Sequence, residues 1–263
     1  MINFIESWKK LKIIVRKRMI GTIPVFEVVE DTDQNNPLPI IVYYHGWQIN
    51  KTLVITQGRK LAAKGFRVVL PDAENHGERI QTVSTIPSLT FFNSIHTNLF
   101  EFGYIIDYFK KRHLTTNFIG VGGLSMGGMT TCALMTHNPE INAAACIMGT
   151  PALTDYRNMI HRHATSRNIY LPQDYFYLTS WIPKYDLSRQ PELLGDRPFF
   201  IWHGDEDEKV PFSQTKAFVE ENPELNMEVI FEHTGHLVQT QTMDRIADFF
   251  ERSHNDHLEE LHK

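Results

Sequence analysis

The chain has 263 residues, with 26 lysines and arginines against 31 aspartates and glutamates, so its formal charge at pH 7 is −5. Hydrophobic residues make up 42% and charged residues 22%, a mixture typical of globular domains and unlike that of disordered chains. The mild acidity argues against nucleic acid as the main partner, because phosphate binding requires a basic surface. The length fits one large α/β domain.

Neither the first residues nor any later stretch has the pattern of an export or membrane segment. Residues 1–10 lack an apolar run followed by a small-residue cleavage site, and nowhere do about 18 apolar residues follow one another. Cys132 and Cys146 lie in apolar runs and have neither a disulfide framework nor a zinc-site spacing. We therefore expect a cytoplasmic protein with no membrane partner and two buried thiols.

Strand and helix patterns alternate along the chain. Runs rich in Ile and Val predict strands, and apolar residues at helical spacing predict the helices between them. The predicted strands are two within 12–29, then 40–44, 66–70, 117–121, 141–148, 199–202 and 227–231. The predicted helices are 53–64, 91–112, 126–137, 212–221 and 238–252. This alternation indicates an α/β fold with a mostly parallel, twisted sheet and helices on both faces.

One long stretch interrupts the alternation. Residues 151–197 lie between two predicted strands and are rich in aromatic residues, among them Tyr156, Tyr170 and Trp181. We interpret this stretch as a small cap insertion over the top of the sheet, within a single domain spanning 1–263. Two ordinary surface helices are the alternative.

The segment Gly123-Leu-Ser-Met-Gly127 matches the pattern G-x-S-x-G. A predicted strand precedes it and a predicted helix follows it. A strand-to-helix turn with this pattern is sharp and strained, and it exposes the serine hydroxyl at the top of the sheet. The pattern alone also fits a plain glycine-rich turn, so the context makes Ser125 the candidate nucleophile.

A serine nucleophile needs a histidine base, and the base needs an orienting carboxylate. In this architecture both follow the serine along the chain, each in a loop after a later strand. Asp207 follows the predicted strand 199–202, and His236 follows the predicted strand 227–231. These two residues complete a candidate triad with Ser125.

Neighbouring residues compete for both roles. Asp205, Glu206 and Glu208 are alternatives to Asp207, and His233 is an alternative to His236. Asp205 follows a glycine in a predicted turn, where its carboxylate is expected to bind backbone amides. His236 is preferred because the glycine before it lets the loop turn over the sheet.

With these motifs, the chain resembles the α/β-hydrolase superfamily, in particular its prolyl-oligopeptidase-like bacterial carboxylesterases, from about residue 12 to residue 252. Family members carry H-G-x-x-D-x-x-V-P, whose aspartate matches Asp207, and G-H before the last helix, whose histidine matches His236. They also carry H-G after the third strand, matching residues 45–46, and D-x-x-x-H-G, matching 72–77. Asn75 stands where many relatives have glycine.

The resemblance also implies an oxyanion hole built from backbone N–H groups. One donor is the residue after the nucleophile, Met126, at the start of the following helix. The other, by resemblance, is Trp47 in the loop after the third strand. His45 and His203 are expected to hold their loops through backbone hydrogen bonds.

Three further groups are weaker candidates. His161 and His163 lack a third metal ligand and are interpreted as part of a polar helix face. The polar side chains of 72–78 are expected to brace their loop beside the site. The basic residues between positions 9 and 18 are expected to form a solvated strand edge.

We therefore expect a serine esterase that cleaves esters of small to medium acyl chains through an acyl-enzyme, with no metal or cofactor. Its partner is a small-molecule ester, and a homodimer is left open. A prolyl-oligopeptidase-type peptidase or amidase and a thioesterase are alternatives, although such peptidases usually carry an extra domain for which 263 residues leave no room. A non-catalytic ligand receptor on a hydrolase fold is the alternative from another class.

Overall fold

The structure is a computed structural model that describes residues 11–81 and 86–262, so the expectation about residues 1–10 lies outside it. Within these ranges, eight strands form one sheet in the order β1-β2-β4-β3-β5-β6-β7-β8. The strands are β1 Ile13–Ile20, β2 Ile23–Glu30, β3 Leu38–Tyr44, β4 Arg67–Pro71, β5 Thr115–Leu124, β6 Ala143–Ile147, β7 Phe199–Gly204 and β8 Met227–Glu232. Strand β2 runs antiparallel to β1 and β4, and the other neighbours are parallel, which confirms the predicted mostly parallel α/β sheet.

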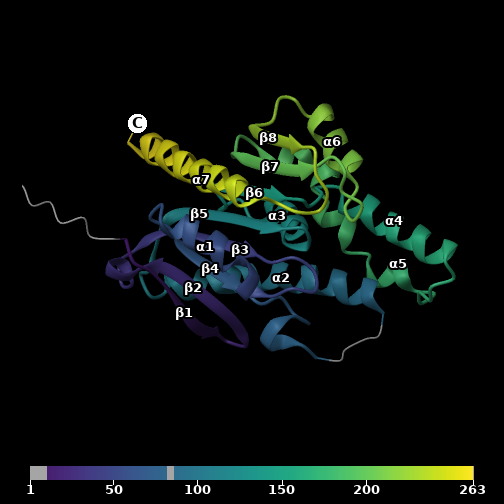
Figure 1. Ribbon diagram of the computed structural model, residues 1–263, viewed down its shortest axis with the longest axis horizontal. Helices are drawn as coiled ribbons and strands as arrows, with labels where there is room; N and C mark the ends of the chain where they lie inside the picture. Colours follow the sequence, from purple (N-terminus) through teal and green to yellow (C-terminus); the bar gives the residue numbers. More distant parts are fainter. Residues whose placement is uncertain (1–10, 82–85, 263) are drawn as a thin grey trace, which may run out of the picture.

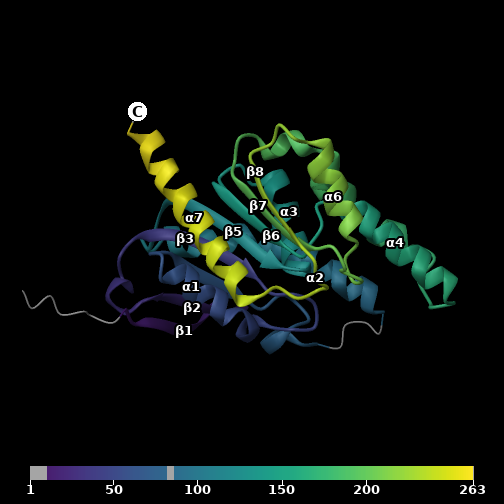
Figure 2. The ribbon, with the colours of Figure 1, turned by 45° about the horizontal axis from the view of Figure 1, so that its top comes forward.

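Helices cover both faces of this sheet. They are α1 Ile55–Ala62, α2 Pro87–Lys110, α3 Met126–His137, α4 Leu153–Ser166, α5 Tyr175–Leu178, α6 Phe212–Glu221 and α7 Thr240–Leu261. Figure 2 shows α1 and α7 on one face and α2 and α3 on the other, and the buried side chains form one cluster on each side. Strand β3 contributes side chains to both clusters, because alternate side chains of a strand point to opposite faces.

Two predicted helix boundaries were wrong by more than two residues. Helix α2 begins at Pro87 rather than at residue 91, with proline in the first turn, where its missing N–H leaves no bond unmade. Helix α7 continues to Leu261 rather than ending at residue 252. The ring of His254 packs against Phe66 and Phe118, with centroids 5.7 and 5.0 Å apart, and these contacts hold the last turns on the sheet.

The segment 151–197 contains α4, α5 and three short 3₁₀ turns between residues 182 and 194. Figure 1 shows α4 and α5 at the end of the molecule away from the chain's C-terminus. The 3₁₀ turns pack against α3, and the buried carboxylate of Asp186 accepts the N–H of Thr154 at 2.7 Å. The start of α4 is thereby fixed to the body of the protein.

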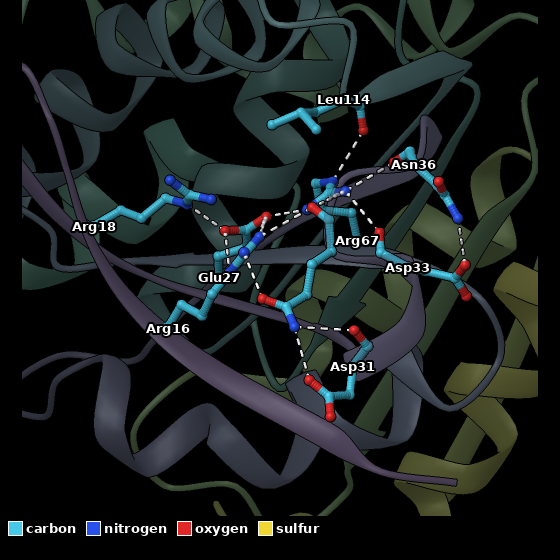
Figure 3. A network of polar contacts seen from close by, with 9 residues as sticks. Arg16, Arg18, Glu27, Asp31, Asp33, Asn36, Arg67 and Leu114 are labelled. Atoms are coloured by element: carbon cyan, nitrogen blue, oxygen red, sulfur yellow. Dashed lines mark hydrogen bonds and ion pairs between the residues drawn. The ribbon is translucent and has the colours of Figure 1, made fainter.

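A buried polar network joins the first strands (Figure 3). The carboxylate of Glu27 on β2 forms ion pairs with Arg16 and Arg18 from β1 and with Arg67 from β4. Arg67 is fully buried and also donates to the carbonyl of Leu114 at 2.9 Å. The expected solvated strand edge is therefore wrong for Arg16 and Arg18, whose side chains are only 24% and 26% exposed.

The ionisation of Glu27 depends on this network. Burial alone raises the pKa of its carboxyl, but hydrogen bonds from Arg16 and Arg18 and the charge of Arg67 outweigh that effect and lower the pKa below its usual value. Removing the negative charge leaves Arg67 buried beside two further cations.

We expect Glu27→Gln to lower the free energy of unfolding by about 3–5 kcal/mol, because breaking one side of a buried ion pair leaves the other charge uncompensated. Urea denaturation measures the effect. The double variant Glu27→Leu/Arg67→Leu, which removes both buried charges, is the control and should recover much of the loss. Equal urea midpoints for Glu27→Gln and the wild type would show that the network does not stabilise the fold.

Candidate active site

Ser125 lies in a sharp turn between β5 and α3, with φ at +53° and ψ at −111°. This φ lies in the region that favours glycine, so the turn stores backbone strain. A Cβ on Gly123 would lie 2.5 Å from the backbone of Gly127, and one on Gly127 would lie 2.3 Å from the carbonyl oxygen of Tyr44. Only glycine fits at either position. The N–H of Ser125 donates to the carbonyl of Ile147 at 2.8 Å, which ties the turn to β6.

The structure brings the three predicted triad residues together. His236 Nε2 lies 2.9 Å from Ser125 Oγ, and His236 Nδ1 lies 2.6 Å from Asp207 Oδ2. An ionised carboxylate only accepts hydrogen bonds, so Nδ1 carries the proton and Nε2 is left to accept the hydroxyl proton of the serine. This is the arrangement that a serine nucleophile and its base require.

Asp207 is held as an anion by its surroundings. Its side chain is fully buried, and its Oδ1 accepts the N–H groups of Lys209 and Val210 at 2.8 and 2.9 Å. Burial alone raises the pKa of this carboxyl, but hydrogen bonds from His203, His236 and the Val210 amide outweigh it and hold the pKa well below its usual range. Asp207 is therefore ionised at neutral pH.

His203 holds its loop through a backbone hydrogen bond, as expected. Its Nε2 lies 3.0 Å from the carbonyl oxygen of Val210 and 3.3 Å from Asp207 Oδ2, and the ring is fully buried. It joins the end of β7 to the loop that carries the acid.

The competing acid and base lie next to each other, away from the triad. His233 is 79% exposed, and its Nδ1 lies 3.1 Å from a carboxylate oxygen of Asp205. Its Nε2 lies 3.3 Å from Glu206. Asp205 thus binds an imidazole rather than the backbone amides expected from its place in the turn.

The two candidate oxyanion donors belong to elements that meet at Ser125. Met126 is the first residue of α3, and the first N–H groups of a helix have no acceptor within it. Trp47 lies in the loop after β3. That loop approaches the nucleophile closely, because a Cβ on Gly46 would lie 3.5 Å from the Cβ of Ser125.

The polar loop 72–78 braces the loop that carries Trp47. The buried carboxylate of Asp72 accepts the backbone N–H groups of Lys51 and Glu78 at 3.0 and 2.9 Å and pairs with the Lys51 ammonium. Asn75 has φ at +65°, a conformation that asparagine tolerates better than most residues. Lys51 was not predicted from the sequence, because its partner Asp72 lies 21 residues away along the chain and no local pattern links the two.

A cavity of about 760 Å³ opens at Ser125 and His236. Most of its lining is apolar and comes from four parts of the chain: the loop after β3, the start of α2, the segment 151–197 and the loop before α7. The lining residues are Gly46, Trp47, Gln48, Ile49, Gln57, Ile86, Pro87, Ser88, Phe91, Leu124, Ser125, Met148, Tyr156, Ile160, His163, Ala164, Ile169, Tyr170, Leu171, Lys209, Val210, His236, Leu237 and Val238.

The aromatic residues of 151–197 do not all face this cavity. Tyr156 and Tyr170 line it, whereas the ring of Trp181 stacks on His96 at 4.3 Å between ring centroids. The contribution of Phe91 on α2 to the cavity lining was not predicted, because the apolar stripe of that helix is typical of residues packed in the core.

No metal-binding arrangement involves His161 and His163. The ring of His161 packs against Phe176 at 4.6 Å between centroids. Within 11–81 and 86–262, no three His, Cys, Asp or Glu side chains are grouped as metal ligands. In the same ranges, no helix is both long enough and apolar enough to cross a membrane.

A model of the prolyl oligopeptidase family matches residues 100–256, more than half of the chain. The chain belongs to this family. The match covers the nucleophile turn, the acid loop and the histidine loop, and it places the protein among the serine hydrolases, as the sequence analysis expected.

Individual proteins agree with this assignment. The chain is 29% identical over 250 residues to a putative esterase, YitV, of Bacillus subtilis (strain 168), covering 90% of this chain and 98% of that protein. It is 24% identical to the esterase YjfP of Escherichia coli (strain K12), covering 76% of this chain and 81% of that protein. The solved structure of TT1662 from Thermus thermophilus covers 92% of this chain and 98% of its own, with a TM-score of 0.72 at 16% identity, which confirms the α/β-hydrolase fold.

Acid should destabilise the protein through His45. Burial lowers the pKa of His45 from 6.5 to about 4. The unfolded chain therefore takes up this proton near pH 6.5, while the folded protein resists it until about pH 4. This contribution to stability is complete above pH 6.5 and is lost as the pH falls towards 4, by about 2 kcal/mol between pH 7 and pH 5.

Urea denaturation at both pH values measures this loss. The variant His45→Asn has no titrating group at this position and should lose correspondingly less stability between pH 7 and pH 5. An equal loss in the variant and the wild type would contradict the assignment to His45.

Proposed function

We propose that the protein is a serine esterase that acts through a Ser125–His236–Asp207 triad. The observation that carries the proposal is the continuous hydrogen-bonded chain from Ser125 Oγ through the imidazole of His236 to Asp207, at 2.9 and 2.6 Å, at the mouth of an apolar cavity. The names of the two relatives, both esterases, support ester hydrolysis among the reactions that such a triad performs.

In the first half of the reaction, His236 Nε2 takes the proton of Ser125 Oγ as the oxygen attacks the ester carbonyl carbon. The carbonyl oxygen becomes an anion in the tetrahedral intermediate, and the N–H groups of Met126 and Trp47 stabilise it. Asp207 stays ionised, in keeping with its lowered pKa, and stabilises the imidazolium that forms on His236.

In the second half, the intermediate collapses and His236 gives its proton to the leaving alcohol. The acyl group is then bound to Ser125. Water, activated by His236, attacks this ester through the same oxyanion site, and the carboxylic acid leaves as Ser125 recovers its proton.

The cavity suggests how the ester lies. His236 must protonate the leaving oxygen, and its loop continues through Leu237 and Val238, which also line the cavity. We place the alcohol on that side. The acyl chain then lies along the apolar surface formed by Phe91 and Ile160, and a volume of about 760 Å³ suits small to medium chains. In this arrangement 151–197 serves as the cap of a single domain.

A peptidase, an amidase or a thioesterase would use the same triad, and a ligand receptor would use the same fold. The intact hydrogen-bonded triad supports turnover over a receptor. A small-molecule ester remains the proposed partner. A cytoplasmic location and a homodimer stay predictions from the sequence.

Hydrolysis of p-nitrophenyl esters tests the triad. Ser125→Ala and Asp207→Asn should each lower kcat by about 10⁴-fold or more, because one removes the nucleophile and the other the orientation of the base. Asp205→Asn is the matched control on the same loop and should keep wild-type kcat. Ester hydrolysis that survives in Ser125→Ala would refute the proposal.

The position of the acyl chain is tested with Ile160→Trp, which narrows the cavity beside α4. We expect kcat/KM for octanoate esters to fall by about tenfold or more while acetate esters are hydrolysed as before, because the lost space is needed only by long chains. Arg162→Ala, an exposed change on the same helix, is the control. A uniform fall over all chain lengths would show that the acyl chain lies elsewhere.

A further inference from the structure

Two loops at the carboxyl edge of the sheet are joined along their length. The first, 45–51, carries Trp47, and the second is 72–78. The N–H of Ala73 donates to His45 Nε2 at 3.0 Å, and the N–H of Gln48 donates to His76 Nε2 at 3.1 Å. The polar contacts of Lys51 with Asp72, described above, close the far end. The first loop is therefore held at its start, its middle and its end.

Two hydrogen bonds, one of them within the first loop, involve the peptide groups on either side of the Trp47 Cα. His45 Nδ1 donates to the carbonyl oxygen of Gly46 at 2.8 Å. This carbonyl and the N–H of Trp47 belong to one planar peptide group and point in opposite directions, so fixing one fixes the other. The next peptide group joins Trp47 to Gln48, and its N–H is the one that donates to His76.

The backbone conformation of Gln48 is intrinsically unfavourable. Its φ is +61°, a conformation that a non-glycine residue adopts only when its surroundings enforce it. The ring of His76 holds this part of the loop through two contacts. It accepts the amide proton of Gln48, and it packs edge-on against the ring of Trp47 at 4.8 Å between centroids.

The tautomer of His76 is determined by its second hydrogen bond. Its Nδ1 donates to the carbonyl oxygen of Glu74 at 2.8 Å, which leaves Nε2 as an acceptor in the neutral ring. The residue is 4% exposed, and burial lowers the pKa of the imidazole. The groups with charge or titratable protons around it are His45, with ring centroids 5.0 Å apart, and Asp72.

We propose that His76 is a positioning residue of the oxyanion hole: by holding the amide of Gln48, its neutral imidazole aims the backbone N–H of Trp47 at the carbonyl oxygen of the substrate. His45 holds the preceding peptide group in the same way. The inference rests on the proposed function, since it takes Ser125 as the nucleophile and Trp47 as a donor. His76 itself touches neither the substrate nor the triad.

The test separates the hydrogen bond from the packing of the ring. His76→Phe keeps an aromatic ring beside Trp47 and removes the acceptor, whereas His76→Gln places an amide oxygen near the position of Nε2. Removing a whole oxyanion donor typically lowers kcat by about 10²–10³-fold. For a donor that is present but misdirected, we expect His76→Phe to lower kcat by about 10–100-fold and to change KM for p-nitrophenyl butyrate by less than about twofold.

A second readout reports on the oxyanion hole directly. An alkyl boronic acid bonds to a serine oxygen as a tetrahedral adduct, and one boron oxygen then occupies the oxyanion site. Its inhibition constant should rise in His76→Phe by about the same factor as kcat falls. His76→Gln should recover most of both losses. Glu74→Gln, which changes a side chain of the same loop that binds Asn93 and Thr97 of α2 rather than the loop 45–51, is the matched control and should behave as the wild type.

Thermal unfolding of each variant shows that the comparison is made on folded protein. If His76→Phe does not fold, His76→Leu, which also lacks an acceptor, takes its place with the same expected losses. Unchanged kcat and boronate affinity in the acceptor-free variant would overturn the inference, as would a loss that His76→Gln does not recover. Activity that survives in Ser125→Ala refutes the proposed function itself, whereas Ser125-dependent activity that ignores His76 refutes this inference alone.

Discussion

The site depends on how closely the backbone of α3 approaches the end of β3. Gly127 lies so near the carbonyl of Tyr44 that no side chain fits between them, and Gly123 meets the backbone of Gly127 in the same way. This close contact makes the turn at Ser125 sharp, with a positive φ, and the hydroxyl of Ser125 lies 2.9 Å from His236 Nε2. It also brings the first turn of α3, which carries Met126, beside the loop after β3, which carries Trp47. The two candidate oxyanion donors therefore lie close together. The close approach of two backbone segments thus determines both the turn at the nucleophile and the position of the candidate oxyanion donors.

The rest of the site is assembled around this turn by polar contacts between loops. Two loops that carry functional groups are held by buried side chains that bind backbone atoms: His203 and Asp207 hold the acid loop, and His45, His76 and Asp72 hold the loop after β3. His45 and His76 differ from His236 in one respect. Both nitrogens of each ring bind backbone groups, whereas His236 Nε2 binds a side-chain hydroxyl and can exchange its proton. Burial and bonding therefore separate structural imidazoles from the one that can act as a base.

Much of this arrangement could be predicted from the sequence, because it depends on patterns of residues that are close together in the chain. The apolar runs of 40–44 and 117–121 identify central strands, and the glycines around Ser125 identify the turn. The order of Asp207 and His236 after later strands identifies their partners. Helix ends were predicted less well, since α7 is prolonged by the contact of His254 with Phe66 and Phe118, far away in the chain. The cavity lining and the partner of Lys51 could not be predicted, because they depend on side chains that only the folded chain brings together.

The polar network of Figure 3 lies at the other edge of the sheet from the triad. Arg67 begins β4 and binds carbonyls just before β3 and β5, so the network joins the amino ends of the parallel strands, whereas Ser125, Asp207 and His236 follow their carboxyl ends. One buried ion-pair network of the fold therefore lies away from the reacting groups. Since its contacts do not include the triad, we expect substitutions around Arg67 to leave the geometry of the triad unchanged. A sequence that diverges at its site to accept a new ester can offset the resulting loss of stability at the opposite edge, and this separation gives the fold room to acquire new specificities.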